Sequence, residues 1–298
     1  SLSVTKPFYT PEGISLSYDI YRRDVNTSSL NVVTYNTSSY GAGIRFGVPL
    51  SEKNAISYGL TLDSTEVSNL VVGTSPTRYI QYCSDVTGSS NSTGCSMTSV
   101  IASLGWSLDS RDNVLMPKKG EFTRVNGEIS TPGLDIQMYK ITLQETWYKD
   151  VTKDFTFMLN GQFGYANSYG GKEFPFFKNF YVGGVNTVRG YAQGAIGPYQ
   201  TGASSNDNIF LGGNKQIIGN AELFMPVPFL KNNDQFRLSA FIDAGNVYGH
   251  SESINLSDLR YSAGMGVMWV SPFGPLKLVY AKPFNEQAHD KTESIQFQ

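Results

Sequence analysis

Long stretches in which every second residue is apolar constrain the fold of this chain more than any other feature. ISLSYDIY (14–21) and AISYGLTLD (55–63) alternate in this way, as do FTFMLNGQFGY (155–165), FRLSAFIDAG (236–245) and YSAGMGVMW (261–269). This period is that of a β-strand, because successive side chains of a strand point to opposite faces. No comparable helical pattern is found, so the sequence predicts an all-β chain whose strands have one apolar and one polar face.

Strand length separates a membrane barrel from a soluble sandwich. We predict thirteen strands, near 1–6, 14–24, 37–48, 54–66, 97–110, 120–130, 136–148, 154–166, 215–225, 235–246, 258–270, 274–283 and 293–298. Several of them are 10 to 13 residues long, whereas a globular strand averages about 5–6 residues and a tilted membrane-spanning strand needs about 9–11. A soluble β-sandwich also alternates, but its outward face is polar. The sequence therefore favours an antiparallel transmembrane β-barrel, whose closure satisfies every backbone group in lipid.

The connections between these strands alternate in length. The tight ones are 6–13, 49–54, 149–154 and 271–275. The long ones are 25–36, 67–96, 167–214 and 247–257, whereas 131–136 is short where a long one is due. Short turns on one rim and long loops on the other are typical of outer-membrane barrels.

Aromatic side chains lie at the ends of several predicted strands. Trp147, Tyr148, Tyr165 and Trp269 are predicted to form belts at the two membrane interfaces. Glu145 falls on the apolar face of its strand. Its carboxylate is expected either to reach the headgroup region or to sit at a local bulge.

Charge and cysteine content limit the cell compartment and the partners. The formal net charge is −2, with 23 basic and 25 acidic residues, so nucleic acid is not an expected partner. No run of 18 apolar residues predicts a transmembrane helix. Cys83 and Cys95 flank a short polar loop, which predicts a disulfide that stabilises the protein by about 3 kcal/mol and an oxidising compartment. The only histidines, His250 and His289, lie far away in other loops, so neither a metal nor another cofactor is expected.

A glycine-rich stretch inside the long connection 167–214 contains a single cation. GGVNTVRGYAQGAIGP (183–198) carries only Arg189. Together with GGKEFPFFKNFYVGG (170–184), the tetrapeptide Val188, Arg189, Gly190 and Tyr191 resembles the sixth loop of BamA-type outer-membrane assembly proteins. These are β-barrel insertases of the superfamily that also includes two-partner secretion transporters.

Other parts of the chain carry the same resemblance. SLSVTKPFYTPEG (1–13) is similar to an early family strand and turn, and FIDAGNVY (241–248) and SPFGPLKLVYAKPF (271–284) are similar to its last strands. DSRDNVLMPKKGEF (109–122) resembles a family turn on the periplasmic side, with Asp109, Arg111, Pro117 and Gly120 at the matching points. The resemblance therefore covers essentially all of residues 1–298.

The resemblance also implies that part of the barrel is missing. The family barrel has sixteen strands, and residue 1 aligns with about the fourth. The final strand, Ser294, Ile295, Gln296, Phe297 and Gln298, would lie at the seam where first and last strands meet, and it stops before the terminal aromatic of the family. The N-terminal periplasmic domains are absent too. We therefore expect a piece of a longer protein, or a deletion variant, whose sheet need not close.

The family motif implies a structural role for Arg189. In the family, the loop spanning 167–214 folds back into the barrel lumen. Glu222 and Asp243 lie on the polar faces of the two strands that follow it. By resemblance Arg189 bridges these acids, Gly190 allows close approach to the wall, and Tyr191 packs nearby. The alternative is a solvated surface arginine, which the cost of an unpaired buried charge disfavours.

The family implies insertion of unfolded outer-membrane proteins into the bacterial outer membrane. A parting seam would expose strand edges that template an incoming strand, in a locally thinned bilayer. Assembly lipoproteins would bind the missing domains. A two-partner secretion pore is the nearest alternative because it shares the motif, and a passive porin is disfavoured by the pinned loop. A hydrolase is disfavoured because only His250 and His289 could serve and no G-x-S-x-G is present, so no enzyme activity is expected.

Overall fold

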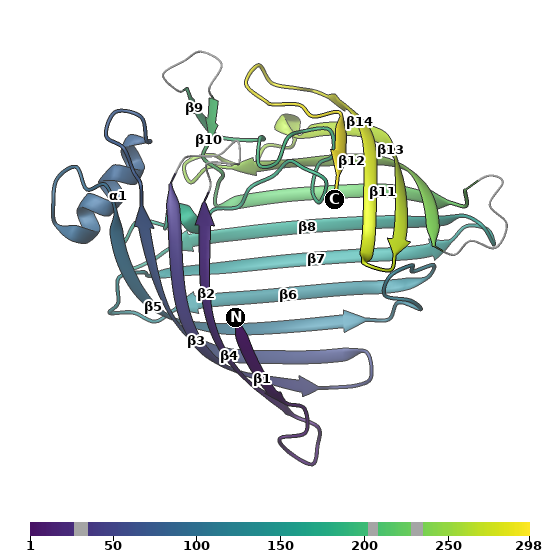
Figure 1. The fold of residues 1–298 in the computed structure, drawn as a ribbon, viewed down its shortest axis with the longest axis horizontal. Coiled ribbons are helices and arrows are strands. Elements are labelled where there is room, and N and C mark those ends of the chain that lie inside the picture. The colour runs from purple at the N-terminus through teal and green to yellow at the C-terminus, as the bar shows by residue number, and fades with distance from the viewer. Residues whose placement is uncertain (27–34, 202–207, 228–234) are drawn as a thin grey trace.

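The computed structural model describes residues 1–26, 35–201, 208–227 and 235–298. Thirteen strands form one antiparallel sheet in which each strand pairs with the next one along the chain (Figure 1). The strands are β1 (Leu2–Lys6), β2 (Ser15–Asn26), β3 (Asn36–Pro49), β4 (Asn54–Ser68), β5 (Cys95–Asp109), β6 (Gly120–Ser130), β7 (Met138–Asp150), β8 (Thr156–Ser168), β11 (Lys215–Met225), β12 (Phe236–Tyr248), β13 (Arg260–Ser271), β14 (Gly274–Phe284) and β15 (Ile295–Phe297). Between β8 and β11, strands β9 (Tyr199–Thr201) and β10 (Asn208–Phe210) form a separate hairpin.

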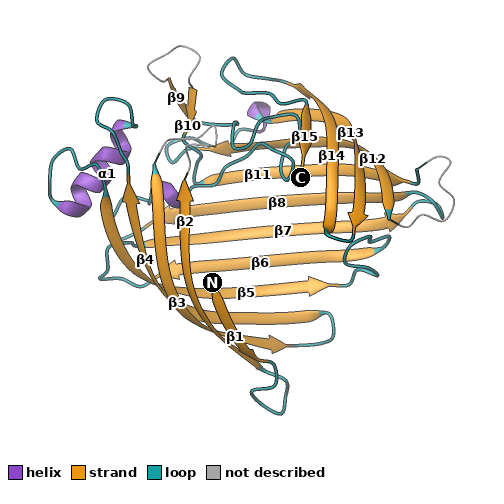
Figure 2. Cartoon of the chain, viewed as in Figure 1, coloured by secondary structure: helices purple, strands orange, loops and turns teal. Residues whose placement is uncertain are grey.

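The prediction of an all-β antiparallel fold is confirmed, and each of the thirteen predicted strands corresponds to one strand of the large sheet. The sheet curves into a trough, with β1 to β4 forming one wall and β11 to β15 the other (Figure 2). In the described part of the chain β1 and β15 are its two edges, with no ladder between them. The sheet is therefore not closed.

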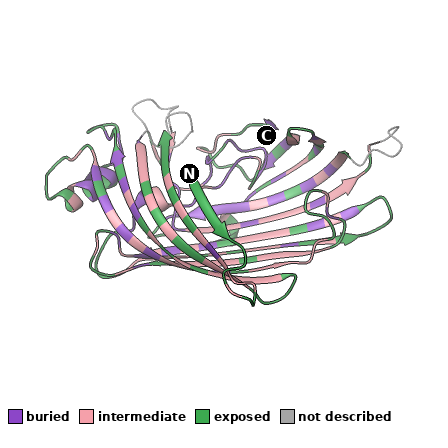
Figure 3. Cartoon of the chain, turned by 60° about the horizontal axis from the view of Figure 1, so that its bottom comes forward, coloured by how far each residue is buried: buried purple, intermediate pink, exposed green. Residues whose placement is uncertain are grey.

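The two faces of the sheet differ in polarity as the alternation predicts. On β4 the side chains of Leu60 and Leu62 are 54% and 52% exposed, whereas Asp63 and Thr65 are 3% and 1% exposed. Exposed and buried residues alternate along the strands (Figure 3). The convex face is thus apolar and open, and the concave face carries the buried polar groups. This is the reverse of a water-soluble sheet and suits a sheet whose convex face meets hydrocarbon.

Loop length also follows the prediction. The connections 50–53, 151–155 and 272–273 lie on one rim, and 69–94, 169–214, 249–259 and 285–294 on the other. The seven-residue connection 131–137 is the short member of the long-loop rim. The loop predicted at 25–36 falls mostly outside the described residues.

The prediction that the chain has no helix is wrong at one place. Helix α1 (Thr77–Thr87) lies at the long-loop rim and ends at Gly88, whose φ is 69°. Its buried side chains are Tyr79, Ile80, Tyr82 and Cys83. A helix of 11 residues is marginal alone and depends on packing against the rest of the fold. Its apolar face is too short to stand out in the sequence.

Two 3₁₀ segments, Phe176–Lys178 and Leu256–Asp258, complete the helical elements of the described residues. None of these helices is long and apolar enough to cross a membrane.

The hydrophobic core fills the trough near the long-loop rim. It joins α1 to the segment 169–214 and to the walls, through residues such as Tyr79, Phe176, Val188, Tyr191 and Val247. The rings of Tyr79 and Phe176 stack with centroids 3.9 Å apart. The segment between β8 and β11 is therefore packed into the trough as part of the core.

The aromatic belt is seen on the rim with the short turns. Trp147 and Trp269 lie exposed on the convex face near the ends of their strands, and the ring of Trp269 stacks on that of Phe236 at 5.5 Å. Tyr148 does not belong to this belt, because it points to the concave face and lines a cavity there. Tyr165 is half-buried near the opposite rim.

Glu145 lies on the convex face of β7 without a bulge. The register of β7 with β6 and β8 runs unbroken through this residue, so the bulge alternative is wrong. Its carboxylate accepts a hydrogen bond of 2.5 Å from the hydroxyl of Thr123 on β6.

Candidate functional site

The candidate site lies where the segment 169–214 meets β11 and β12. The segment is tied to itself by bridges between Phe180 and Gly213 and between Val182 and Ile196. These short bridges turn a long glycine-rich connection into a defined structure. They place the tetrapeptide 188–191 against the concave face of the sheet.

The structure brings Arg189 together with both acids that the sequence indicated. The guanidinium donates to Asp243 from Nε and Nη2, each at 2.7 Å, and to Glu222 from Nη1 at 2.8 Å. The backbone N–H of Arg189 also donates to Asp243, at 3.0 Å. All three residues are buried, with exposures of 3% or less. The two-pronged pairing with Asp243 uses the planar fork of arginine, which lysine lacks.

Two neighbours complete this arrangement. The ring of Phe241 lies under the guanidinium, with Cζ 3.4 Å from the ring centroid. The Asn220 amide donates to the second oxygen of Asp243 at 2.8 Å. Both residues were missed by sequence reasoning, although each points to the concave face beside one of the acids. Such a face-on cation–π contact adds to the ion pair when both are desolvated.

The electrostatics keep Arg189 charged. Burial would lower the pKa of the guanidinium, but the hydrogen bond and charge of Asp243, followed by those of Glu222, raise this pKa above its ordinary value. Breaking a buried pair of this kind costs about 3–5 kcal/mol because it leaves an unpaired charge. The buried trio of Arg189, Glu222 and Asp243 therefore anchors the segment strongly only while all three side chains are present.

A polar cavity lies beside the anchor on the concave face. It has a volume of about 280 Å³, and Tyr148, Asn160, Glu222 and Lys277 are among its lining residues. Glu222 Oε1 has no hydrogen-bond partner in the described part of the chain. The Lys277 ammonium is 3.9 Å from the other oxygen of Glu222. The cavity is therefore polar and suited to water.

The other motif residues fit tightly against the walls. Gly190 has a φ of +87°, and a Cβ there would lie 3.0 Å from the Cβ of Ala281. Val188 is fully buried. The Tyr191 hydroxyl donates to the carbonyl of Phe284 at 2.9 Å. Only glycine combines this backbone conformation with this close approach.

Gln296 of β15 contacts the motif directly. The sequence placed it only in the seam strand and did not predict this contact. The N–H of Gly190 donates to Gln296 Oε1 at 3.1 Å, and Gln296 Nε2 donates to the carbonyl of Tyr191 at 2.7 Å. The alternation in SIQFQ was the available signal, because it puts Gln296 on the polar face between two apolar residues.

The other residues of the predicted seam strand lie on the convex face or bond to β14. Ile295 and Phe297 are exposed on the convex face. The Ser294 carbonyl accepts from the N–H of Ala281, and Lys277 and Gln298 exchange backbone hydrogen bonds. Strand β15 thus pairs with β14.

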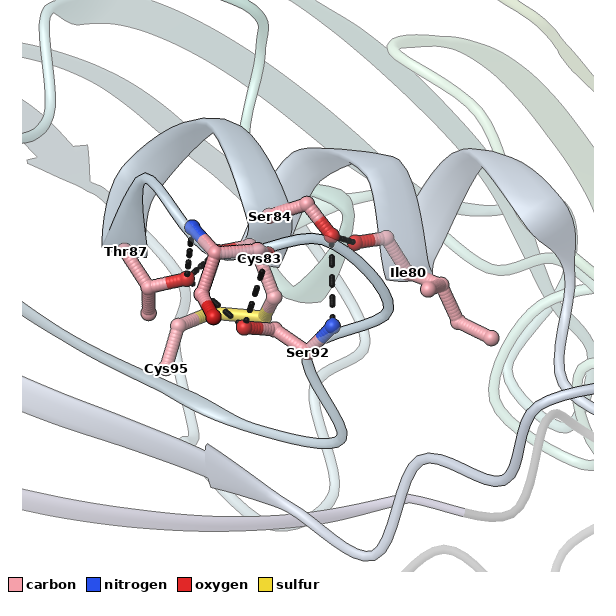
Figure 4. The surroundings of a disulfide bond; sticks show 7 residues. Ile80, Cys83, Ser84, Thr87, Ser92 and Cys95 are labelled. Carbon is pink, nitrogen blue, oxygen red and sulfur yellow. Dashed lines mark hydrogen bonds between the residues drawn. A yellow bond between two sulfur atoms is a disulfide. The ribbon is translucent and has the colours of Figure 1, made fainter.

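The predicted disulfide between Cys83 and Cys95 is confirmed (Figure 4). It joins α1 to the start of β5. Both cysteines are buried, whereas most of the polar loop between them is exposed. The helix carries Cys83 inward, because Cys83 lies on its buried face with Tyr79, Ile80 and Tyr82.

The two histidines lie apart and in different settings. His250 Nδ1 is 3.3 Å from the side-chain nitrogen of Asn214, and the ring of His289 stacks on Tyr199 at 3.9 Å. Among the described residues no group of three or more histidines, cysteines and acids is placed to hold a metal ion.

Residues 1–298 match the family model of the Omp85 superfamily domain over their whole length. The chain belongs to the Omp85 superfamily. It is 36% identical to the outer membrane protein assembly factor BamA of Neisseria meningitidis serogroup B, over all of this chain and 40% of that protein. It is also 29% identical to the sorting and assembly machinery component 50 homolog of Bos taurus, over 64% of this chain and 42% of that protein.

Two solved structures resemble this chain in fold. The crystal structure of BamA from Haemophilus ducreyi lacking POTRA domains 1–3 has a TM-score of 0.89 at 28% identity, covering 99% of this chain and 60% of that one. CdiB from Acinetobacter baumannii has a TM-score of 0.55 at 14% identity, covering 96% and 46%, and shares the fold alone. The resemblance to BamA-type proteins is confirmed, and an outer membrane is indicated as the location. This chain spans about two fifths of the length of the curated relatives.

Proposed function

We propose that this chain is the barrel of an outer-membrane protein assembly factor, which inserts and folds β-barrel proteins in the bacterial outer membrane. The observation that carries the proposal is the similarity to the Neisseria BamA over the full chain, at 36% identity. The BamA structure from Haemophilus supports it, because it matches 99% of this chain with a TM-score of 0.89. The substrates would be unfolded outer-membrane proteins. Assembly lipoproteins would bind parts of the longer protein beyond this chain.

The mechanism needs no covalent chemistry. A strand edge offers a row of backbone donors and acceptors, which templates the strand of an incoming protein by hydrogen bonding. In a barrel this edge would be exposed at the seam between the first and last strands, and β15 would be the last. The bilayer would thin near the seam, which lowers the barrier to insertion. Accordingly we propose that the protein is not an enzyme and uses no cofactor.

Within this function the anchored segment has a structural role. We assign Arg189, Glu222 and Asp243 to fixing the segment 167–214 in the lumen, where it supports the walls from inside. The buried trio supports this assignment, since neither acid lies near Arg189 in sequence and both accept its hydrogen bonds. A porin, by contrast, needs an open constriction.

A secretion pore of the same superfamily is the second candidate. Its support is the CdiB fold, which matches at a TM-score of 0.55 but only 14% identity. Full-length protein reconstituted in lipid vesicles distinguishes the two. With an unfolded eight-stranded barrel as substrate, an assembly factor speeds folding into the vesicles, measured by gel mobility without boiling. Vesicles holding an unrelated barrel are the control.

The assembly proposal fails if the folding rate equals that of the control vesicles. The same vesicles would support the secretion candidate if they released a cognate secreted protein while leaving barrel folding unchanged.

A further inference from the structure

The tetrapeptide 188–191 is held from two directions. On one side the Arg189 side chain bonds to β11 and β12. On the other side the main chain bonds to the connection between β14 and β15. The N–H of Ala192 donates to the carbonyl of Lys291 at 2.9 Å, and the N–H of Glu293 donates to the carbonyl of Gly190 at 2.8 Å. Residues 291–293 therefore pair with the motif as a neighbouring antiparallel strand would.

Gln296 extends this contact onto β15 itself. Its amide accepts from the N–H of Gly190 and donates to the carbonyl of Tyr191, so the donor and the acceptor on adjacent residues fix its orientation. It is 6% exposed. The side chain thus provides both of the bonds that the backbone of a neighbouring strand would provide. No water can replace them readily, because the site is buried.

We propose that Gln296 is a positioning residue that couples the Arg189 anchor to strand β15, so that release of the motif loosens the last strand. The significance of this coupling for insertion rests on the proposed function, but the coupling itself is a property of the fold. It connects the interior loop to the strand that would form one side of the seam.

The physical reason is that neither the motif 188–191 nor β15 can move away from the other without exposing buried polar groups that then lack a partner. If the motif moved away, the Gln296 amide would lose a donor and an acceptor together. If β15 moved away, the Gly190 N–H and the Tyr191 carbonyl would lose theirs. Buried groups left without partners are unfavourable. Such a linkage acts equally in both directions.

Amide hydrogen exchange of the full-length protein in lipid vesicles tests the coupling. Gln296→Met keeps the length of the side chain and removes both hydrogen bonds. We expect the amides of Gly190 and Ala192 and those of β15 to exchange at least about tenfold faster, as for a local opening that has lost two buried hydrogen bonds. Phe297→Leu is the matched control, because Phe297 lies on the same strand and points to the convex face.

The decisive measurement is made on Arg189→Lys. The guanidinium bonds to β11 and β12, yet the proposal requires the amides of β15 to exchange faster in this variant. In the double variant the two effects must be less than multiplicative, since both act through one contact. Exchange of β15 at the wild-type rate in Arg189→Lys, or multiplicative effects, would overturn the proposal.

Gln296→Glu separates a hydrogen-bonding role from simple packing. The carboxylate keeps the acceptor for Gly190 but opposes the Tyr191 carbonyl, whereas the protonated acid restores the donor. Exchange should therefore be fast at about pH 8 and return toward the wild-type rate near pH 5, where a buried carboxyl is largely protonated. Wild-type protein measured at each pH is the reference, because Glu222, Asp243 and Glu293 also lie close to the motif. Fast exchange at both pH values contradicts the proposal.

These readouts are independent of the folding assay. Coupling without accelerated barrel folding would leave the linkage intact and overturn the proposed function. Accelerated folding without coupling would support the proposed function and overturn the proposed role of Gln296.

Discussion

At the scale of single residues, one buried arginine organises the interior of this protein. Arg189 carries three charge-assisted hydrogen bonds from its side chain to two strands. Its value comes from geometry as well as charge, because two parallel N–H groups match the two oxygens of Asp243. Lys277 lies near Glu222 but at 3.9 Å. Lys277 therefore already supplies a positive charge near Glu222. Arg189 adds the pair of parallel N–H groups that bind both oxygens of Asp243.

Replacing Arg189 with lysine is expected to weaken the anchoring of the segment 169–214. Lysine keeps the charge but loses the paired contact. The free energy needed to open the segment should therefore fall by about 2–4 kcal/mol, somewhat less than the roughly 3–5 kcal/mol for removing one partner of a buried ion pair. The measurement is limited proteolysis of the segment together with heat-modifiability on gels. Arg22→Lys is the control, because its ion pair with Asp24 is largely exposed. Wild-type protease resistance in Arg189→Lys would contradict this role.

At the scale of elements, α1 depends on contacts that lie outside the helix. Its apolar face packs on the core, and the disulfide ties Cys83 of the helix to Cys95 at the start of β5. The Ser84 and Thr87 hydroxyls bond back to carbonyls of the preceding turn (Figure 4). Such back-bonding does not strengthen a helix. The helix is thus held chiefly by packing and by the covalent link.

Removing the disulfide is expected to destabilise α1 without disturbing the sheet. The bond closes a loop with a sequence separation of 12, and opening such a loop costs about 3 kcal/mol in the chain-entropy model. In the Cys83→Ser, Cys95→Ser variant, amide exchange and proteolysis should rise over 77–94. The β-sheet signal in circular dichroism should stay the same. Loss of that sheet signal would show that the link supports the whole trough.

At the scale of the whole molecule, the convex surface is the functional exterior. Large apolar side chains are exposed there on strands from β1 to β15. On a soluble protein so extensive an apolar surface would drive association. In an outer membrane the same surface meets lipid. The three tryptophans of the chain, Trp106, Trp147 and Trp269, all lie on strands near the rim with the short turns.

Lipid-quenching experiments can check this orientation. In full-length protein whose only tryptophans are these three, reconstituted in bilayers, lipids brominated high on the acyl chain should quench fluorescence more strongly than lipids brominated near its end. The physical reason is that tryptophan belts lie at the interface with the headgroups. If a water-soluble quencher reduced the fluorescence and brominated lipid did not, this face would lie in water instead.

Much of the fold could be predicted because its cause is local. Alternation in AISYGLTLD (55–63) assigns a strand and its two faces without reference to any other part of the chain. The pairing of adjacent strands follows, since short turns join antiparallel neighbours. The family motif pointed to Arg189 and its acids. By contrast, α1 has too few apolar residues to be recognised locally.

The sequence by itself determined the strands, the polarity of their faces and the positions of the short turns, because each depends on residues only a few positions apart. Only the tertiary structure decided that the Gln296 amide meets Gly190, 106 positions away. That contact depends on the path of the segment 169–214 through the trough and on the register of β15 with β14. Neither has a local signature, since both result from the sum of many packing contacts along the walls.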